Sequence, residues 1–598
     1  MPSLWSDFIL QNIQSIFDDI FVYVHTSKEP SSEYHEQIKA INTILKYQKE
    51  YDKLSIKMKQ GLAEKDELKE WILSGSQVGC CSRIIYQGSI LFAEKHKGLF
   101  KSWEFRNNCT EEPLCNIVST KACIPEYDRV TKEKEHTEKT FTKVLNNIKS
   151  LMNSSKSEYI TNKKLVRKTF FVLDVETAPD AEIVITGQNR VKVHDALIDW
   201  ISRFGENKNY VLDLASWNIR DNNCKVLTDT CIKAQYGAKR EFYVINLGAK
   251  AMARVTENSY KLLAKFCKNE MISIPGDKKL LHIQNAVNES ILSSERRQDT
   301  LMYVNGDCTK WSACETMASF ISMNQGLKNV FGEDIYRYNA LTFCSWANKQ
   351  IQVPQSILQN LRFLSDSTKY IEEGTVIHST QNFLQGMFNY SSSIKAVIST
   401  EFALYMFKKL NPNVFLHCSH LEHSDDYSLI VRTADLDTFE KFRIYHKLSQ
   451  KLFGINDSIK KTNIQGHIQE FISLFSFNGQ LYYPYIKKMK EVGTNLPCSD
   501  FRSDVMSIIS RVSECIRIGI PLESAYFMQR VHCASLADAY SLSPGMRNCS
   551  GSVSDTFSRP LELFGLPDSL PILSVVVKGN TENYRIFNFG DLKDKKLL

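Results

Sequence analysis

VFLHCSHLEHSDDYSLIVRTAD, at residues 414–435, predicts a β-hairpin with an acidic turn. Its two arms are apolar and rich in residues that favour strands, and the short turn between them contains Asp425 and Asp426. A second apolar strand, LMYVNGD at 301–307, ends in Asp307. Asp307 and Asp425 are 118 positions apart, and a glycine-containing turn and a long helix over 386–410 lie between them. We therefore expect a strand end and a tight turn to project these carboxylates outward.

Carboxylates in such positions suit phosphoryl transfer that uses two metal ions. This chemistry needs acidic ligands that hold two divalent cations about 3.5–4 Å apart, and hard oxygen ligands favour Mg²⁺ or Mn²⁺. A single Asp in a turn is weak evidence for metal binding, because Asp favours turns for local hydrogen-bonding reasons. The order and spacing of Asp307, Asp425 and Asp426 resemble those in the palm of template-directed polymerases. We expect Asp307 and Asp425 to bind two Mg²⁺ or Mn²⁺ ions, with Asp426 in support.

Six short motifs resemble those of the L proteins of bunyaviruses, which are segmented negative-strand RNA viruses. GDCTKWSA at 306–313 resembles polymerase motif A, QGMFNYSSS at 385–393 resembles motif B, and HSDD at 423–426 resembles motif C. Lys460-Lys461-Thr462 resembles motif D, EFIS at 470–473 resembles motif E, and KAQYGAKREFYV at 233–244 resembles the pre-A motif, also called F. The motifs occur in the family's order. The resemblance implies an RNA-dependent RNA polymerase, on the orthobunyavirus, tospovirus or emaravirus side of the order.

The resemblance adds catalytic and metal-binding candidates to the three aspartates. It implies that Glu470 is an accessory metal ligand. One of the two lysines of motif D is suited to protonate the departing pyrophosphate, as positioned acids do; an exposed lysine pair without such a role is the equally weighted alternative. The expected catalytic residues are Asp307, Asp425, Asp426, Lys460 and Lys461, and the expected metal ligands are Asp307, Asp425, Asp426 and Glu470.

A further set of residues is expected to contact nucleotide or RNA. Lys233 and Arg240 are suited to neutralise the incoming triphosphate, because Arg binds phosphate bidentately; the alternative is that they are surface charges. Gly386 lets the backbone approach a ligand closely. Asn389 and the serines after it are expected near the ribose, although Ser and Asn at a helix start also serve as plain caps. The full set is Lys233, Gln235, Arg240, Lys310, Gln385, Gly386, Asn389 and Ser391.

The nearby residues Lys239, Lys250 and Arg254 are interpreted as surface charges or template-backbone contacts, and Trp311 as a core residue that fixes the strand of Asp307.

The predicted fold class is α+β, a right-hand polymerase with fingers, palm and thumb and an N-terminal helical core lobe. Apolar spacing typical of helices predominates before residue 165, and β-rich runs begin near residue 170. The expected divisions are a helical core lobe at 1–165, fingers with the pre-A motif at 166–300, a palm with motifs A to E at 301–490, and the start of a thumb at 491–598. An insertion of the fingers is expected within the palm at about 325–380.

Composition permits a polyanionic partner without requiring one. The chain of 598 residues has a net charge of +7. The stretch from Arg129 to Lys168 contains eleven Lys or Arg and four Glu, a composition that suits either phosphate binding or a solvated linker. Its 16 Cys show no repeated C-x-x-C spacing, and no apolar run approaches the ~18 residues of a membrane span. Expected partners are RNA template and product, ribonucleoside triphosphates and viral nucleoprotein bound to RNA, in the host cytoplasm and in the virion.

Other functions are weaker matches to the sequence. FVLDVET at 171–177 is similar to the first motif of proofreading exonucleases, but no partner acids follow in the required order. Pro179-Asp180 lacks the acid and Lys spacing of a cap-cleaving endonuclease. A reverse transcriptase is disfavoured by His423-Ser424 and by EFIS. Complete L proteins are far longer, so we expect a region of one, and a catalytically incompetent RNA-binding or assembly fragment is the remaining alternative.

Overall fold

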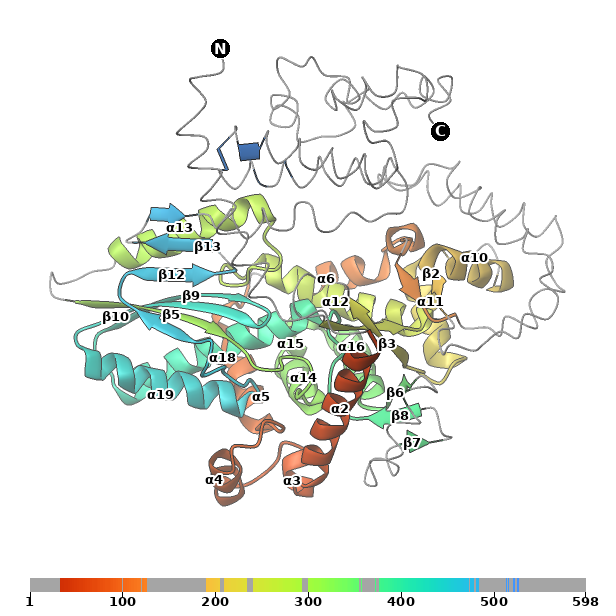
Figure 1. Cartoon of the computed structure of the whole chain (residues 1–598), viewed down its shortest axis with the longest axis horizontal. Helices are drawn as coiled ribbons and strands as arrows, with labels where there is room; N and C mark the ends of the chain where they lie inside the picture. The colour runs from red at the N-terminus through yellow and green to blue at the C-terminus, as the bar shows by residue number, and fades with distance from the viewer. Residues whose placement is uncertain are drawn as a thin grey trace, which may run out of the picture.

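The computed structural model describes residues 33–98, 101–119, 121–125, 190–204, 209–233, 240–292, 299–353, 357, 371–372, 376–472, 474–477, 480–482, 512, 515, 520–521 and 524–525. Several predicted features lie outside these residues: Gln235, the basic stretch of 129–168, the runs around Asp174 and Pro179, and most of 491–598. Within the described part of the chain, helices and several small sheets alternate (Figure 1), which confirms the α+β class.

A four-stranded antiparallel sheet contains the predicted hairpin. Its strand order is β11 (Asn463–Gln465), β5 (Thr300–Asp307), β10 (Asp426–Thr433) and β9 (Leu416–His423). The hairpin prediction is confirmed, because β9 and β10 pair with Asp426 opposite His423 and only two residues connect them. One of these two, Ser424, has φ +59°, in the left-handed region that tight hairpin turns use.

Apolar side chains cover both faces of this sheet. On one side, Leu429 and Val431 join the largest core, to which α18 (Asn389–Leu410) and α19 (Leu436–Leu452) contribute. On the other, Ile430 packs in a second core with residues of α13 (Gly276–Leu292). Because successive strand residues point to opposite faces, packing on both sides explains why β10 is buried along most of its length. In Figure 1, α13 and α19 lie on opposite sides of the sheet.

A second sheet has the order β4-β3-β6-β8-β7. It contains β3 (Leu227–Lys233), β4 (Arg240–Ile245), β6 (Lys349–Gln352), β7 (Ile371–Glu372) and β8 (Val376–Ser379), and only the β3–β6 pair is parallel. The remaining strands form a three-stranded sheet of β12 (Ile468–Phe471), β13 (Leu474–Phe477) and β14 (Gln480–Tyr482), and the pair β1 (Ala122–Cys123) and β2 (Val191–Lys192).

Helices surround and connect these sheets. They are α2 (Glu33–Asp52), α3 (Ile56–Lys59), α4 (Lys65–Leu73), α5 (Ser82–Lys95), α6 (Ser102–Thr110), η1 (Leu114–Ile117), α10 (Val193–Phe204), α11 (Val211–Arg220), α12 (Leu247–Lys265), α14 (Met317–Gly326), α15 (Lys328–Phe331) and α16 (Glu333–Ala347). The helical character expected near the N-terminus is present over the described residues from 33 to 110.

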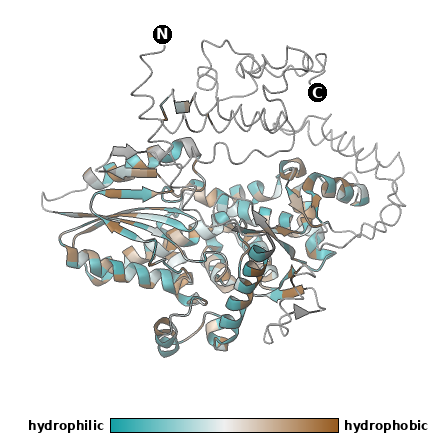
Figure 2. Ribbon diagram, in the orientation of Figure 1, coloured by the Kyte–Doolittle hydropathy of each residue, from teal (hydrophilic) through white to brown (hydrophobic). Residues whose placement is uncertain are grey.

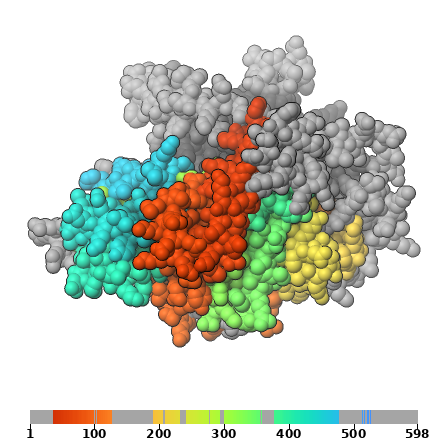
Figure 3. Space-filling model, turned by 90° about the horizontal axis from the view of Figure 1, so that it is seen from below, coloured from red at the N-terminus to blue at the C-terminus, as the bar shows by residue number. Residues whose placement is uncertain are grey.

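The N-terminal helices share the largest core with the rest of the chain. α5 packs against α14 and α18, and Ile85 and Phe92 of α5 belong to the same buried cluster as Leu429. Seen from below, the red and orange N-terminal segment lies between the turquoise segment that includes α19 and the yellow segment (Figure 3). Hydrophilic and hydrophobic positions alternate along the outer helices (Figure 2). No helix among the described residues is long and apolar enough to cross a bilayer.

Candidate active site

Three aspartates meet at one end of the four-stranded sheet. Asp307 is the last residue of β5 and lies opposite Asp426, the first residue of β10, in the strand register. Asp425 occupies the turn before β10, and its carbonyl accepts a hydrogen bond of 2.8 Å from the backbone N–H of Cys308. The strand pairing therefore brings together two positions that are more than a hundred residues apart in the sequence.

The electrostatics of Asp426 show that several acidic groups gather here. The pKa of Asp426 is raised to about 7, first by burial and then by the charges of Asp425, Asp307 and Glu470, with Lys461 acting in the opposite direction. Glu470 comes from β12, whose position is fixed by Asn305 of β5: Asn305 accepts a hydrogen bond of 2.9 Å from the Glu470 N–H. The structure thus groups the four predicted metal ligands.

Of the predicted lysine pair, Lys461 reaches the acidic cluster. Its Nζ donates to Oδ2 of Asp307, whereas Lys460 is exposed. The backbone places Lys461 there, because the N–H of Ser458 donates to the Asp307 carbonyl at 2.9 Å and the Lys461 N–H donates to the Ser458 carbonyl at 3.0 Å. The Lys461 side chain remains mostly exposed, so its charge is accessible to solvent and to a ligand.

The donor chemistry of this cluster fits divalent cations. Carboxylate oxygens are the ligands that Mg²⁺ prefers, and the pKa of Asp426 is raised by burial and by the neighbouring carboxylates, which Lys461 only partly offsets. The side chains are not in a ligating arrangement, however: no group of three or more His, Cys, Asp or Glu among the described residues is placed to hold a metal ion. The expected pair of Mg²⁺ or Mn²⁺ ions therefore stays a proposal.

A tyrosine and an aspartate that were not predicted support the end of β5. A Cβ at Gly306 would overlap the Tyr427 ring on the neighbouring strand, so the absence of a side chain lets the ring lie across the β5 backbone. Tyr427 donates to Oδ1 of Asp457 at 2.8 Å, and Thr462 donates to the same oxygen at 2.6 Å. Gly306 inside an apolar strand was the signal in the sequence for this close approach.

The predicted motif B begins in a loop with unusual backbone geometry. Over Asn382–Phe388, hereafter the 382–388 loop, four alternate residues have positive φ: Asn382 at +73°, Leu384 at +70°, Gly386 at +96° and Phe388 at +47°. Three of them are not glycine, so the loop stores backbone strain. Gly386 is exposed and Gln385 is partly buried.

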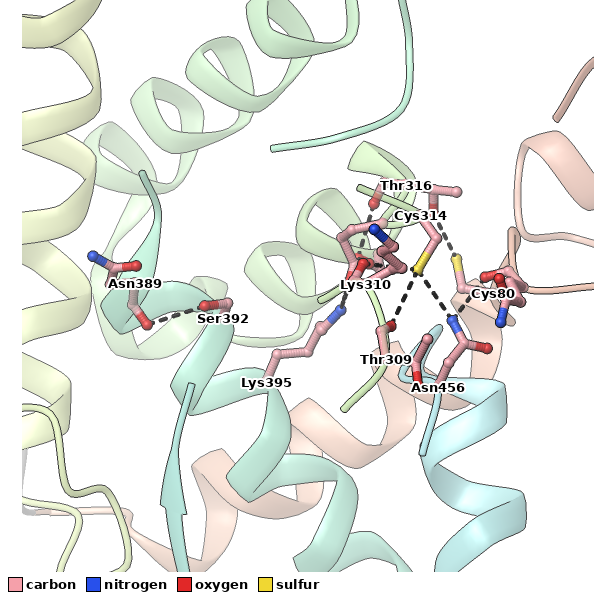
Figure 4. Close-up of polar contacts among 12 residues, drawn as sticks. Cys80, Thr309, Lys310, Cys314, Thr316, Asn389, Ser392, Lys395 and Asn456 are labelled. Carbon is pink, nitrogen blue, oxygen red and sulfur yellow. Dashed lines mark hydrogen bonds and ion pairs between the residues drawn. The ribbon is translucent and has the colours of Figure 1, made fainter. Parts of the chain in front are cut away.

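Two residues of the predicted nucleotide-contacting set lie at the start of α18. Asn389 donates from its amide to the Gly386 carbonyl at 3.3 Å and is partly buried. Ser391 is fully buried, and its hydroxyl donates to Glu257 of α12. Figure 4 shows Asn389 beside Ser392, whose hydroxyl donates to the Asn389 carbonyl at 3.1 Å. The serine side chains of this segment are therefore engaged inside the protein.

The residues that follow Asp307 continue into the core. Lys310 is exposed and has φ +51°. Trp311 packs against the largest core, in agreement with its interpretation as a core residue. Lys395 of α18 lies 5.8 Å from the Trp311 ring centroid and donates to the buried Glu315. Figure 4 shows Lys395 extending from α18 toward this segment, and the amide of Asn456 donating a hydrogen bond of 3.2 Å to Sγ of Cys314.

The predicted pre-A residues are only partly visible. Lys233 and Arg240 pair in register at the ends of β3 and β4, so the backbone places them side by side; their side chains, and all of Gln235, lie outside the described part. Arg254 donates to both oxygens of Glu112, at 3.0 and 2.7 Å. Burial lowers the pKa of Lys250.

Comparison with known proteins indicates the family of this chain. The family model described as bunyavirus RNA dependent RNA polymerase matches residues 105–577. The chain belongs to this family.

Curated relatives carry the name RNA-directed RNA polymerase L. The chain is 26% identical over 392 residues to that of Schmallenberg virus, 25% over 440 residues to that of Bunyamwera virus and 21% over 359 residues to that of Andes orthohantavirus. These alignments cover 57%, 66% and 52% of this chain but 17%, 19% and 17% of the relatives. The chain therefore spans less than a fifth of the length of the polymerases it matches.

Proposed function

We propose that this chain contains the catalytic centre of an RNA-dependent RNA polymerase that uses two divalent metal ions. The observation that supports the proposal is the convergence of Asp307 and Asp426 in strand register, with Asp425 in the adjoining turn and Glu470 close enough to raise the Asp426 pKa. Family membership supplies the reaction class. In the reaction, a 3′ hydroxyl attacks the α-phosphate of a ribonucleoside triphosphate, and pyrophosphate leaves.

The proposed divisions follow the sequence prediction. The sheet of β5, β9, β10 and β11 would form the palm of 301–490, and β3 and β4 would belong to the fingers of 166–300, with an insertion at about 325–380. The helices before residue 165 would form the core lobe, and the thumb would begin near 491. RNA, ribonucleoside triphosphates and nucleoprotein–RNA are the proposed partners, and the host cytoplasm and the virion are the proposed locations.

The donor chemistry of the residues present fits a site for two Mg²⁺ or Mn²⁺ ions, with Asp307 and Asp425 as the proposed ligands and Asp426 and Glu470 in support. Such ions, when bound, activate the attacking hydroxyl and stabilise the leaving oxygen. The chain's own contribution is to fix the carboxylates through the β5–β10 pairing. Lys461, whose Nζ is at Asp307, holds a proton that we propose passes to the departing pyrophosphate.

The remaining predicted contacts keep their proposed roles around this centre. Lys233 and Arg240, which are partners in the β3–β4 register, would neutralise the triphosphate, and Gln235 would contact the nucleotide. Lys310, three residues after Asp307, and Gly386, in the 382–388 loop, are exposed, and both would contact nucleotide or RNA. Gln385 and Asn389 would contact the nucleotide from the 382–388 loop and the start of α18.

Primer extension tests the proposal directly. The purified chain, a short primed RNA template, labelled ribonucleotides and Mn²⁺ should give labelled product, and Asp425→Ala should abolish it. Asp437→Ala is the matched control, because Asp437 is an exposed carboxylate in the first turn of α19, and it should leave incorporation unchanged. Preference for deoxynucleotides would indicate a reverse transcriptase, and RNA binding without incorporation would indicate an incompetent fragment; either result refutes the proposal.

A further inference from the structure

The helix that follows the 382–388 loop has no cap of its own. The first N–H groups of any helix lack partners inside it, and at α18 the N-cap residue is Phe388, which provides no side-chain hydrogen bond. Glu257 of α12 fills this role: its carboxylate accepts from the Tyr390 N–H at 2.9 Å, from the Ser391 N–H at 3.2 Å and from the Ser391 hydroxyl. A carboxylate 133 positions away in the sequence therefore caps α18.

The charge of Glu257 suits this position. A helix N-terminus has partial positive charge, so an anion there is stabilising. Burial raises the pKa of Glu257, whereas its hydrogen bonds from Ser391 and Tyr390 and the nearby charge of Arg254 lower it. Arg254 lies one turn earlier on α12 and is itself held by Glu112. Glu257, Arg254 and Glu112 thus form a series of alternating charges that begins at the N-terminus of α18.

The other end of the loop is attached to the segment that follows Asp307. The Asn382 N–H donates to the Glu315 carbonyl at 3.0 Å, and the Phe383 N–H donates to the Ser312 carbonyl at 3.3 Å. The Asn382 side chain donates to the hydroxyl of Tyr243, in β4, at 3.1 Å. Since strained backbone persists only where its surroundings over-determine it, both attachments are needed to hold the positive-φ residues between them.

A second buried acid acts on the same helix. Ser393 is fully buried and donates to Oε1 of Glu270 at 2.8 Å. The Glu270 carboxylate also accepts from the N–H groups of Ile272 and Ser273, at 2.8 and 2.9 Å. The hydroxyls of Ser391 and Ser393 therefore fix α18 from two directions, which gives the serine run a role other than direct contact with ribose.

We propose that Glu257 is a positioning residue for nucleotide addition: by capping α18 it fixes the 382–388 loop, with exposed Gly386, relative to the Asp307 strand. The inference rests on the proposed polymerase function, because the loop is taken to contact the nucleotide. Glu257 itself does not contact the substrate. Its effect is to keep the end of the loop in one place, while the contacts to Ser312 and Glu315 keep its beginning in place.

Glu257→Gln is the first test, because it keeps the length of the side chain and removes its charge. Hydrogen exchange of the full chain should accelerate about tenfold at the amides of 384–391, the order expected when hydrogen bonds to a charged group become neutral ones. In primer extension, KM for the nucleotide should rise about tenfold while kcat stays within about threefold of wild type. Glu289→Gln, at an exposed carboxylate paired with Lys268, is the matched control and should change neither measurement.

A helix cap without a positioning role gives a different result. If exchange accelerates only at Tyr390 and Ser391, and the amides of 384–388 and the nucleotide KM keep their wild-type values, the inference is overturned. Should Glu257→Gln fail to fold, Ser391→Ala removes one of the three donors and should shift exchange and KM in the same direction by a smaller factor; unchanged values overturn the inference. If the wild-type chain incorporates no nucleotide, the proposed function fails, and exchange across 384–388 alone decides whether Glu257 fixes the loop.

Discussion

Lys395→Met should expose the energetic cost of a buried ion pair between α18 and the segment after Asp307. The side chains of Lys395 and Glu315 are 0% and 1% exposed, and Nζ of Lys395 contacts the Glu315 carboxylate. The ammonium group also lies 5.1 Å from the Phe320 ring centroid. Methionine fills a similar volume but leaves the carboxylate with the Ser319 hydroxyl as its remaining side-chain donor. Breaking a buried pair from one side costs about 3–5 kcal/mol, because the other charge stays buried without compensation.

The cost should depend on pH in a defined direction. Burial raises the pKa of Glu315, and Lys395 is the main group that lowers it, so Lys395→Met should raise this pKa further. A carboxyl group whose pKa is higher in the folded than in the unfolded state contributes stability below its unfolded pKa, and this stability is lost as pH rises through the folded pKa. The variant should therefore be more destabilised at pH 8 than at pH 5.

Urea unfolding followed by circular dichroism at both pH values measures this effect. The double variant Lys395→Met with Glu315→Gln removes the unpaired charge and should recover most of the loss, since replacing both members of a buried pair is often close to neutral. The reasoning is refuted if Lys395→Met costs less than about 1 kcal/mol at pH 8, or if the double variant is no more stable than the single one.

Three further predictions concern the same sheet and its supports. Gly306→Ala should lower the free energy of unfolding by about 1–3 kcal/mol through overlap with the Tyr427 ring, and urea unfolding should show little further loss when Tyr427→Ala is already present. Ser424→Val should lower the free energy of unfolding by about 1–2 kcal/mol, because Ser424 has φ +59°, whereas Ser424→Gly should preserve the circular dichroism spectrum and the urea midpoint. Equal effects of the two substitutions would contradict backbone strain at this position. Burial lowers the pKa of Lys451 to about 8. The free energy of unfolding of the wild type should therefore fall, relative to that of Lys451→Met, as pH is lowered from about 10.5 to about 8. A difference between the two proteins that does not change with pH would count against burial as the cause of the shift.

Local patterns in the sequence determined the hairpin and its acidic turn. Apolar alternation and turn chemistry act over a few residues, so the strands around Asp425 and Asp426 were predictable, and so was the long helix after Gly386. Family motifs further indicated the polymerase class, which the comparisons confirmed. The same local patterns could not give the partners of individual side chains: Ser391, predicted to contact nucleotide, is buried and donates to Glu257.

Tertiary packing alone decided which distant residues meet. Lys461 contacts Asp307, 154 positions away in the sequence, and Glu257 contacts Ser391, 134 positions away. Neither contact produces a periodic pattern in the sequence, because each depends on how whole helices and strands dock. The register that sets Asp426 opposite Asp307 has the same origin: apolar burial on both faces of the sheet selects it, since a shift by one residue would exchange the two faces of every strand. The sequence alone therefore indicated which acidic residues carry the chemistry, whereas the packing of the folded core determined that they converge.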